Sequence, residues 1–363
     1  TDGAVRAIPA KCTGYRAPNY VCGTAWSPDG SCMAAWSADR AVRVYELPHD
    51  WHASPQTYTL SGAGLGQPWG KWSDMVCGMD SLPLAFSVQE AEGVYDFRWY
   101  PGMNSQLPKT ACFATTSRDQ PIHLWDAYTG GLRASYSVYD DMDELAAALS
   151  LTFSPDGSRL LGGLKGEIRI FDVSQPGRDS QKVRLKRQKK KRGAVGQNSI
   201  ISSLACRSDG KVLAIGCYDE TLGLYDTEFY QPMALLDGFA CGVTQAEFDP
   251  SGMYLFVAAR KSDWIAKFDT RNLESPVCYY ARPGDTNQRL QFSLSADGKY
   301  LATGSTDGTA YVYDITHGST GPENVGLVGE APPLPPHSRT YRCSTLCHGV
   351  YHAAGCLHPS TVV

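Results

Sequence analysis

The apolar residues in the middle of the chain follow a two-residue period and predict three short β-strands joined by tight turns. From Leu149 to Phe153 apolar residues alternate with serine and threonine, as in a strand with one buried face. The turn Ser-Pro-Asp-Gly at 154–157 follows, where proline presets φ and glycine adopts a left-handed conformation without steric cost. A second strand, a turn at Lys165 and a third strand ending on Asp172 complete the unit. Three strands are too few to bury a core alone.

The same unit recurs along the chain. Each copy has a turn glycine and, 15 to 17 positions later, an acidic residue that follows an aromatic one. These pairs are Gly30 and Glu46, Gly157 and Asp172, Gly210 and Asp226, Gly252 and Asp269, and Gly298 and Asp314. Another copy closes at Asp126, and from there the closing residues step by 46, 54, 43 and 45 positions. This period and ending are typical of WD repeats in a β-propeller.

The sequence therefore predicts an all-β fold, a WD40-repeat β-propeller. Six copies are clear, and a seventh begins near residues 354–359. We expect seven blades, the last of them incomplete in this chain.

Composition agrees with one propeller of 363 residues, rich in glycine and proline and poor in helical periodicity. The net charge of −4 excludes a uniformly basic surface, so any contact with nucleic acid must be local. Twelve scattered cysteines, several in strand patterns, are consistent with reduced thiols that pack as small apolar residues. The sequence shows neither a signal peptide nor an apolar run of the roughly 18 residues that a membrane span needs. We expect an intracellular soluble protein with no membrane partner.

Breaks in the period predict the organisation of the chain. The segment from Leu84 to Val88 is expected to form the outer strand of the first blade. The insert before it contains three tryptophans, which either anchor a partner peptide or, as we favour, fold back over apolar surface. The predicted parts are an N-terminal tail at 1–18 and a propeller at 19–363, the latter with an insert at 47–93, a basic loop at 182–193, and a linker with the partial seventh blade at 316–363.

Several segments go beyond the generic repeat and resemble a known family. The second repeat contains Val-Tyr-Asp-Phe-Arg-Trp-Tyr at 94–100 and a longer string at 117–130. With further segments at 132–136, 176–179, 199–202, 222–225, 259–261 and 286–289, the chain resembles the telomerase Cajal body protein family from about residue 15 to 315. The start of the fifth repeat at 237–242 and the insert at 61–66 depart from the family's pattern.

The resemblance implies an RNA-binding scaffold without enzymatic activity or cofactor. Its target is expected to be the CAB box of box H/ACA small Cajal body RNAs and, in animals, telomerase RNA. The implied partners are the box H/ACA core proteins and the telomerase ribonucleoprotein, and the implied location is the Cajal body of the nucleus. We expect a monomeric propeller. The alternative is a protein-interaction adaptor that binds no RNA and uses its basic loop only for nuclear import.

The residues themselves also point to RNA. Aspartates in the turns between second and third strands are structural, because Asp bonds its own backbone there. Cations flank the same turns, and in a propeller these turns share one face. Arg289 is expected to open a first strand and to reach that face. A ring of cations would suit phosphate, although the alternative for any one of them is a solvated surface side chain. The candidates are Arg40, Arg118, Lys165, Arg260, Lys261 and Arg289.

The densest charge lies at 182–192, with eight cations and no acid in eleven residues. In its first part cations alternate with Val183 and Leu185, and this part is expected to be an outer strand. Residues 188–193 are expected to form a loop. Three interpretations compete: a solvated loop, a nuclear-import signal and a phosphate-binding arm. We favour RNA contact through Lys189, Lys190, Lys191 and Arg192, and one segment can serve both import and binding.

Reading bases in RNA requires stacking faces and polar edges as well as charge. Tyr218 lies at a predicted turn, and Gln288 stands beside Arg289. Tyr95, Phe239 and Trp264 are further aromatic candidates on the predicted face. The alternative for each aromatic residue is packing between blades.

The sequence contains no catalytic motif, and it offers one weak metal pattern. Six Cys and His residues lie between Cys343 and His358, but their spacing matches no familiar zinc site. We therefore expect no metal.

Overall fold

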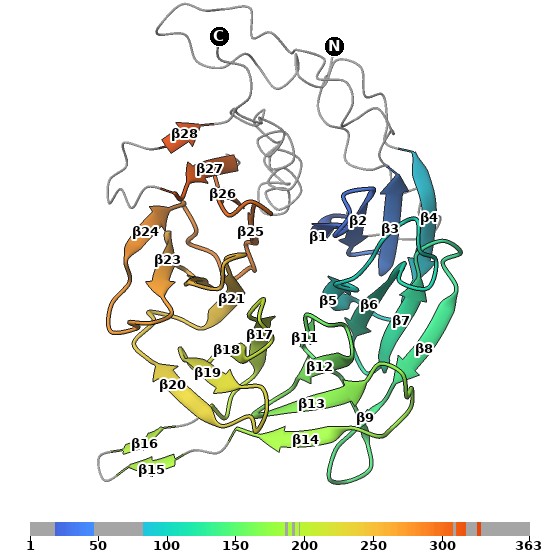
Figure 1. Ribbon diagram of the computed structural model, residues 1–363, viewed down its shortest axis with the longest axis horizontal. Coiled ribbons are helices and arrows are strands. Elements are labelled where there is room, and N and C mark those ends of the chain that lie inside the picture. Colours follow the sequence, from blue (N-terminus) through green and yellow to red (C-terminus); the bar gives the residue numbers. More distant parts are fainter. Residues whose placement is uncertain are drawn as a thin grey trace, which may run out of the picture. The chain divides into compact units, whose positions relative to one another are not determined.

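A computed structural model describes residues 19–46, 83–185, 188–190, 193–195, 197–307, 310–316 and 325–327. These residues form strands and turns, with no helix among them. Six antiparallel four-stranded sheets follow one another along the chain, and within each sheet neighbouring strands are neighbours in sequence (Figure 1). This is the blade arrangement of a WD40 β-propeller, and each of the six clear repeats corresponds to one blade.

The strands of the first three blades begin and end as follows. The first blade contains β1 (Val21–Trp26), β2 (Cys32–Ser37), β3 (Ala41–Glu46) and β4 (Leu84–Gln89). The second contains β5 (Val94–Trp99), β6 (Cys112–Ser117), β7 (Ile122–Asp126) and β8 (Leu132–Tyr136). The third contains β11 (Ser150–Phe153), β12 (Arg159–Gly163), β13 (Glu167–Asp172) and β14 (Gln181–Arg184).

The other blades repeat this order. The fourth contains β17 (Ile201–Cys206), β18 (Val212–Cys217), β19 (Leu222–Asp226) and β20 (Pro232–Leu236). The fifth contains β21 (Val243–Phe248), β22 (Tyr254–Ala259), β23 (Trp264–Asp269) and β24 (Cys278–Ala281). The sixth contains β25 (Phe292–Leu294), β26 (Tyr300–Gly304), β27 (Ala310–Asp314) and β28 (Val325–Leu327).

Two short hairpins stand outside the blades. The first pairs β9 (Val138–Tyr139) with β10 (Leu145–Ala146) between the second and third blades. The second pairs β15 (Gln188–Lys190) with β16 (Gly193–Val195) between the third and fourth blades.

The chain divides into two compact units. The second unit comprises Ser27–Asp29 and Val88–Arg289 and holds the second to fifth blades. The described residues of the first unit belong to the first and sixth blades. Within the second unit the innermost strands are β5, β11, β17 and β21, and the outermost are β8, β14, β20 and β24 (Figure 1).

The turns of the repeat form as their residues predict. At the start of the third blade, Gly157 has a φ of 72° and its N–H donates to the carbonyl of Ser154 at 2.8 Å. The Asp156 carboxylate accepts from the hydroxyls of Ser154 at 2.5 Å and Ser158 at 2.7 Å. Local hydrogen bonds thus replace the strand ladder where the chain reverses.

The core of the second unit consists of the apolar faces of neighbouring blades. One cluster joins the second and third blades through Ile122, Tyr136, Leu151 and Phe171. Two further clusters join the third to the fourth blade and the fourth to the fifth. Fully burying each such side chain stabilises the fold by about 1.5–3 kcal/mol. A blade alone has no such partner surface, so the stacking of blades supplies the core.

Three expectations about elements can be compared with the structure. The outer strand predicted near residues 84–88 is confirmed as β4, which pairs in the first sheet. The loop predicted at 188–193 is wrong, because the backbone pairs there as β15 and β16. The pairing lets backbone groups of residues 188–190 and 193–195 bond to one another instead of to water. Within the expected linker at 316–363, residues 325–327 form β28.

Several expectations lie outside the described residues. They are the tail at 1–18, the tryptophans of the insert, the cysteine and histidine residues after 343, and the partial seventh blade. Among the described residues, no helix of a length and apolarity suited to a membrane span occurs.

Candidate nucleic-acid interface

The turns between second and third strands gather at one end of the second unit. At the second blade, the Thr116 hydroxyl donates to the carbonyl of Ala148, which leads into β11, at 2.6 Å. At the third blade, the Gly166 N–H donates to the carbonyl of Ser199, which leads into β17, at 2.9 Å. The Tyr218 N–H in the fourth blade donates to the next carbonyl of that same segment at 3.0 Å. Each turn thus lies beside the entry of an innermost strand.

The fifth blade joins the same end through Gly242, just before β21. A Cβ at Gly242 would lie 2.8 Å from the Cα of Tyr218, so only glycine permits this approach of the two backbones. The Gly242 carbonyl accepts the N–H of Arg260, in the turn of the fifth blade, at 2.9 Å. We call this side of the second unit, defined by the turns at 117–120, 164–166, 217–221 and 260–263, the turn end.

At the turn end an arginine stacks on a tyrosine. The guanidinium carbon of Arg260 lies 3.9 Å from the centre of the Tyr218 ring, within cation–π range. Both residues are half-buried. The Nε of Arg260 is buried without a hydrogen-bond partner, and Arg260 forms no ion pair with any described residue. The stack therefore presents a positive charge that no acid of the described chain neutralises.

Further cationic and aromatic groups lie in the same blade as Arg260. Lys261 follows Arg260 with an exposed side chain and a φ of 48°. Trp264 and Tyr279 are 51% and 56% exposed, and their rings meet edge to face with centres 6.3 Å apart. Phe239, by contrast, packs against the core between the fourth and fifth blades. The sequence singled out Trp264 but missed Tyr279, which β24 brings to it from the neighbouring strand.

The other predicted turn cations lie in the turns of the first, second and third blades. Arg118 is exposed and lies 3.3 Å from the equally exposed carboxylate of Asp119. Exposed pairs of this kind contribute about 0–1 kcal/mol and leave the cation available. Lys165 is exposed at the turn of the third blade. Arg40 lies in the first unit, half-buried, with a φ of 67°.

Arg289 lies in a different environment from the one expected. It precedes β25 rather than opening it, and its NH1 donates to Asp96 Oδ1 at 3.4 Å. Asp96 lies on β5, with a side chain only 2% exposed, and its Oδ2 also accepts the Leu151 N–H at 2.9 Å. Gln288 is half-buried, and its N–H donates to the Thr286 hydroxyl at 3.2 Å. Since the Thr286 carbonyl accepts the Lys261 N–H at 3.1 Å, this segment reaches the turn end.

The basic run leaves the third blade at the same end. The N–H of Leu185, after β14, donates to the carbonyl of Gly166 at 3.0 Å. The backbone of Lys189 and Lys190 belongs to β15, while Lys191 and Arg192 lie outside the described residues.

One buried cluster was missed by the sequence analysis. The Glu90 carboxylate accepts hydrogen bonds from the Thr115 hydroxyl, from His123 Nδ1 at 3.0 Å, from Ser117 at 3.2 Å and from Trp125 Nε1 at 3.2 Å. Burial disfavours ionisation of Glu90, but the hydrogen bonds from His123, Thr115 and Trp125 outweigh it and lower its pKa. Because its groups are mutually satisfied and enclosed, this cluster has a structural role.

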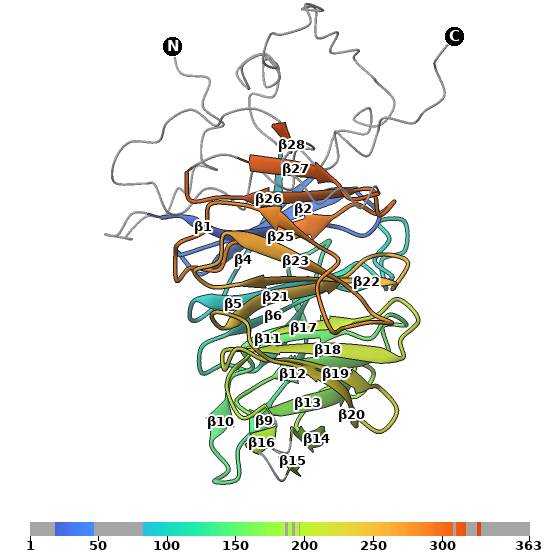
Figure 2. The ribbon, with the colours of Figure 1, turned by 90° about the vertical axis from the view of Figure 1, so that its left-hand side faces the viewer.

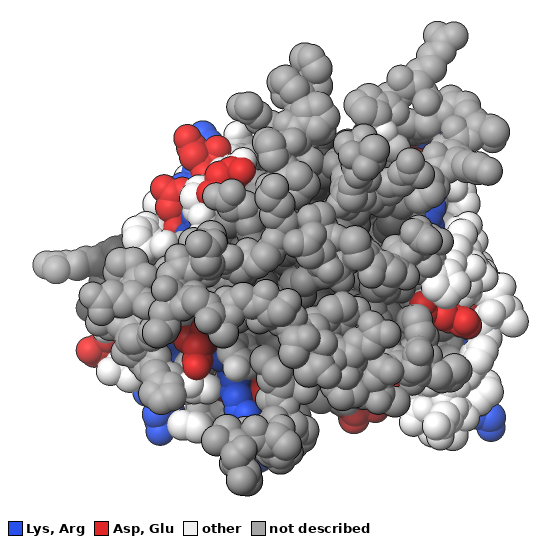
Figure 3. Space-filling model, turned by 90° about the horizontal axis from the view of Figure 1, so that it is seen from above, with Lys and Arg blue, Asp and Glu red and all other residues white. Residues whose placement is uncertain are grey.

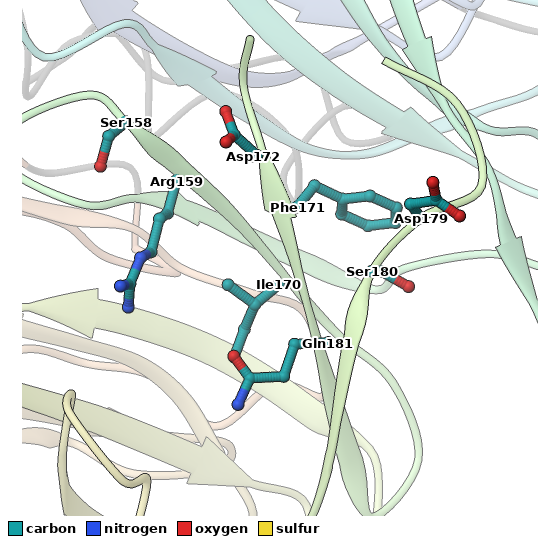
Figure 4. A pocket seen from close by; sticks show the side chains of 8 residues that line it. All are labelled: Ser158, Arg159, Ile170, Phe171, Asp172, Asp179, Ser180 and Gln181. Carbon is teal, nitrogen blue, oxygen red and sulfur yellow. The ribbon is translucent and has the colours of Figure 1, made fainter. Parts of the chain in front are cut away.

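A pocket of about 520 Å³ opens on the third blade, at the opposite end of β12 and β13 from Lys165. Figure 4 shows that its charged groups, Arg159, Asp172 and Asp179, do not converge on one point. In the described part of the chain, no three Cys, His, Asp or Glu side chains are grouped to hold a metal. On the face drawn in Figure 3, the visible described side chains mix both signs of charge without an extended basic patch.

Comparison with known proteins agrees with the repeat architecture. The family model "WD domain, G-beta repeat" matches residues 10–46 and 283–314. Telomerase Cajal body protein 1 of Rattus norvegicus is 40% identical over 301 residues, which are 83% of this chain and 52% of that protein. The protein of the same name from Homo sapiens is 39% identical over 309 residues, covering 85% and 51% of the two chains.

A more distant relative extends this result. Telomerase Cajal body protein 1 homolog of Drosophila melanogaster is 35% identical over 325 residues, covering 86% of this chain and 54% of that protein. The chain spans about half the length of these curated relatives. Because these relatives are 35–40% identical over more than four fifths of this chain, the chain belongs to the telomerase Cajal body protein family.

Proposed function

We propose that this chain is an RNA-binding WD40 scaffold that recognises the CAB box of box H/ACA small Cajal body RNAs and of telomerase RNA. By this binding it directs the ribonucleoprotein, with its core proteins, to Cajal bodies of the nucleus and supports telomerase assembly. The scaffold acts as a monomer without catalysis. The names of its relatives support the telomerase and Cajal body setting.

The observation that carries the proposal is the Arg260–Tyr218 stack. A guanidinium held over a ring can stack on an unpaired base and can donate from its edge to a guanine or a phosphate. No described acid competes for it, and Lys261 stands beside it for an adjacent phosphate. Arg118 and Lys165 extend positive charge along the turn end, while Trp264 and Tyr279 offer further stacking surface.

The test is an Arg260→Lys variant titrated with RNA carrying the CAB-box loop and with the same RNA carrying a scrambled loop. Lysine keeps the charge but cannot stack on a base or form a bidentate hydrogen bond. The free energy of binding to the motif RNA should therefore weaken by about 1–3 kcal/mol. Binding of the scrambled RNA should change little. Arg118→Lys is the matched control, because Arg118 stacks on no described ring and should tolerate the exchange. If Arg260→Lys binds each of the two RNAs with the same affinity as the parent protein does, Arg260 does not read bases.

The alternative is a protein-interaction adaptor. Phe229 and Met233, near the turn between β19 and β20, are 69% and 63% exposed, so apolar contact surface exists away from the turn end. A parent protein that binds no RNA at low salt would favour this alternative.

A further inference from the structure

The strand β14 carries cations that are already paired within the chain. Lys182 Nζ lies 2.7 Å from Asp141 Oδ1 and 3.1 Å from the Glu167 carboxylate. Arg184 NH2 lies 2.6 Å from the other oxygen of Asp141. Asp141 thus neutralises two side chains at the point where the chain enters its basic run.

Asp141 belongs to the hairpin of β9 and β10, residues 138–146, which we call the acidic hairpin. Its tip contains Asp140, Asp141, Asp143 and Glu144. The Asp140 carboxylate accepts the N–H of Met142 at 2.8 Å and that of Glu144 at 2.9 Å, which fixes the shape of the tip. In both ribbon views β9 and β14 lie at the lower edge of the drawing (Figures 1 and 2), in agreement with the ion pairs between hairpin and strand.

The acidic hairpin also holds a second arginine–tyrosine stack. Arg178 lies 4.0 Å from the centre of the Tyr139 ring, and its NH2 lies 2.5 Å from Asp143 Oδ1. This repeats the arrangement of Arg260 on Tyr218, except that here a carboxylate occupies the guanidinium edge. Asp143 and Asp141 thus stand where phosphate oxygens would stand in a complex with RNA.

These carboxylates can be displaced. Asp141 and Asp143 are 72% and 75% exposed, and exposed ion pairs stabilise a protein little and weaken further with salt. The hydrogen bond from Lys182 and the charge of Arg184 lower the pKa of Asp141, so it is ionised at neutral pH. A polyanion that brings several phosphates at once gains from counterion release and competes with such pairs.

We propose that Arg178, Lys182 and Arg184 form a second contact site for an RNA backbone. Asp141 and Asp143 at the tip of the acidic hairpin occupy these cations in the free protein and are displaced from them when RNA binds. The inference rests on the proposed RNA-binding function and extends it, because it names a site and its intramolecular competitor. The site adjoins the turn end, since Arg184 pairs along the sheet with Glu167, two residues after Lys165.

The experiment compares the parent with an Asp141→Asn, Asp143→Asn variant, each titrated with a single-stranded oligouridylate over a range of salt. Each cation freed for a phosphate adds about 0.7 to the slope of log affinity against log salt. Arg178 loses its described ion-pair partner, whereas Lys182 and Arg184 keep Glu167, so the slope should steepen by about 1. At low salt the affinity should rise roughly 5- to 20-fold. The control is Glu228→Gln, Glu274→Gln, which removes the same charge from exposed residues with no ion pair in the described chain.

A second variant identifies the freed cations. Adding Arg178→Gln, Lys182→Gln and Arg184→Gln to the aspartate variant should return the slope to that of the parent. If the parent binds the oligouridylate and the aspartate variant shows the same affinity and salt slope as the parent or the glutamate control, the covered site does not exist. If neither protein binds the oligouridylate at low salt, the proposed function itself fails, and this site with it.

Discussion

At the scale of single residues, the fold depends on buried polar groups that satisfy one another. Glu90 has a side chain only 1% exposed and receives four hydrogen bonds from side chains of the second blade. In the fourth blade Gln197 takes a comparable place, accepting the Tyr225 hydroxyl at 3.0 Å and donating to the Ile215 carbonyl at 2.8 Å. A buried acceptor of this kind holds its donors in one arrangement, because any donor that moved away would be buried without a hydrogen-bond partner.

We predict that Glu90→Gln lowers the free energy of unfolding at pH 7 by about 1–3 kcal/mol, because the amide turns a donor toward groups that need an acceptor. Folding lowers the pKa of Glu90, so its stabilising contribution is complete above the unfolded-state value of 4.5 and is lost as pH falls through the folded value. Urea unfolding from pH 7 to pH 3 measures the free energy of unfolding of both proteins, and the difference between parent and variant should become smaller as the pH falls. The exposed Glu92→Gln is the control, and a gap independent of pH would contradict this interpretation.

The sequence predicted residues whose role is local and missed those whose partners are distant. Turn aspartates were recognised because they bond their own neighbourhood, as Asp39 does by accepting the Ser37 hydroxyl two residues away at 2.6 Å. Glu90 meets Thr115, His123 and Trp125 only after the chain has run 25 to 35 residues further. No short-range pattern marks such a partner, so only the packed blade reveals it.

At the scale of elements, alternation and turn chemistry predicted the strands of the blades. They did not predict the two hairpins between blades. The acidic hairpin has strands of two residues each, too short for a periodic pattern, and its ion pairs join it to cations 41 and 43 positions away. Residues 188–190 and 193–195 pair through their backbone, and a run of consecutive cations does not predict such pairing.

For the hairpin of β15 and β16, we predict that changing Lys189, Lys190, Lys191 and Arg192 to Ala weakens RNA binding for all sequences alike. The slope of log affinity against log salt should flatten by about 0.7 for each phosphate that the variant no longer neutralises. Titrations with the CAB-box RNA and its scrambled counterpart at several salt concentrations measure both effects. Unchanged affinity at low salt, together with loss of nuclear import in cells, would assign this run to targeting alone.

At the scale of the whole second unit, an ion pair joins the two ends of its chain. Asp96 lies on β5 in its first blade, and Arg289, its last residue, follows β24 in its last blade, 193 positions away. Asp96 is buried, and the Nε of Arg289 is buried without a hydrogen-bond partner. The sequence analysis assigned Arg289 to RNA contact because it was expected to open a first strand and to reach the face of the turn cations. Its engagement with a buried carboxylate instead favours a role in holding the blades together.

We therefore predict that Asp96→Asn lowers the free energy of unfolding by about 2–4 kcal/mol, because it leaves the Arg289 charge partly buried without its partner. Arg289→Gln should cost at least as much, because it leaves the more deeply buried Asp96 carboxylate without its cation. The double variant should cost less than the sum of the two, with a coupling of about 0.5–3 kcal/mol. Urea denaturation of the four proteins measures this cycle. Additive effects would show that the pair is not coupled. At temperatures where all four remain folded, oligouridylate should bind parent and Arg289→Gln with the same salt slope. A flatter slope for Arg289→Gln would mean that RNA draws the guanidinium away from Asp96 and uses it as the sequence suggested.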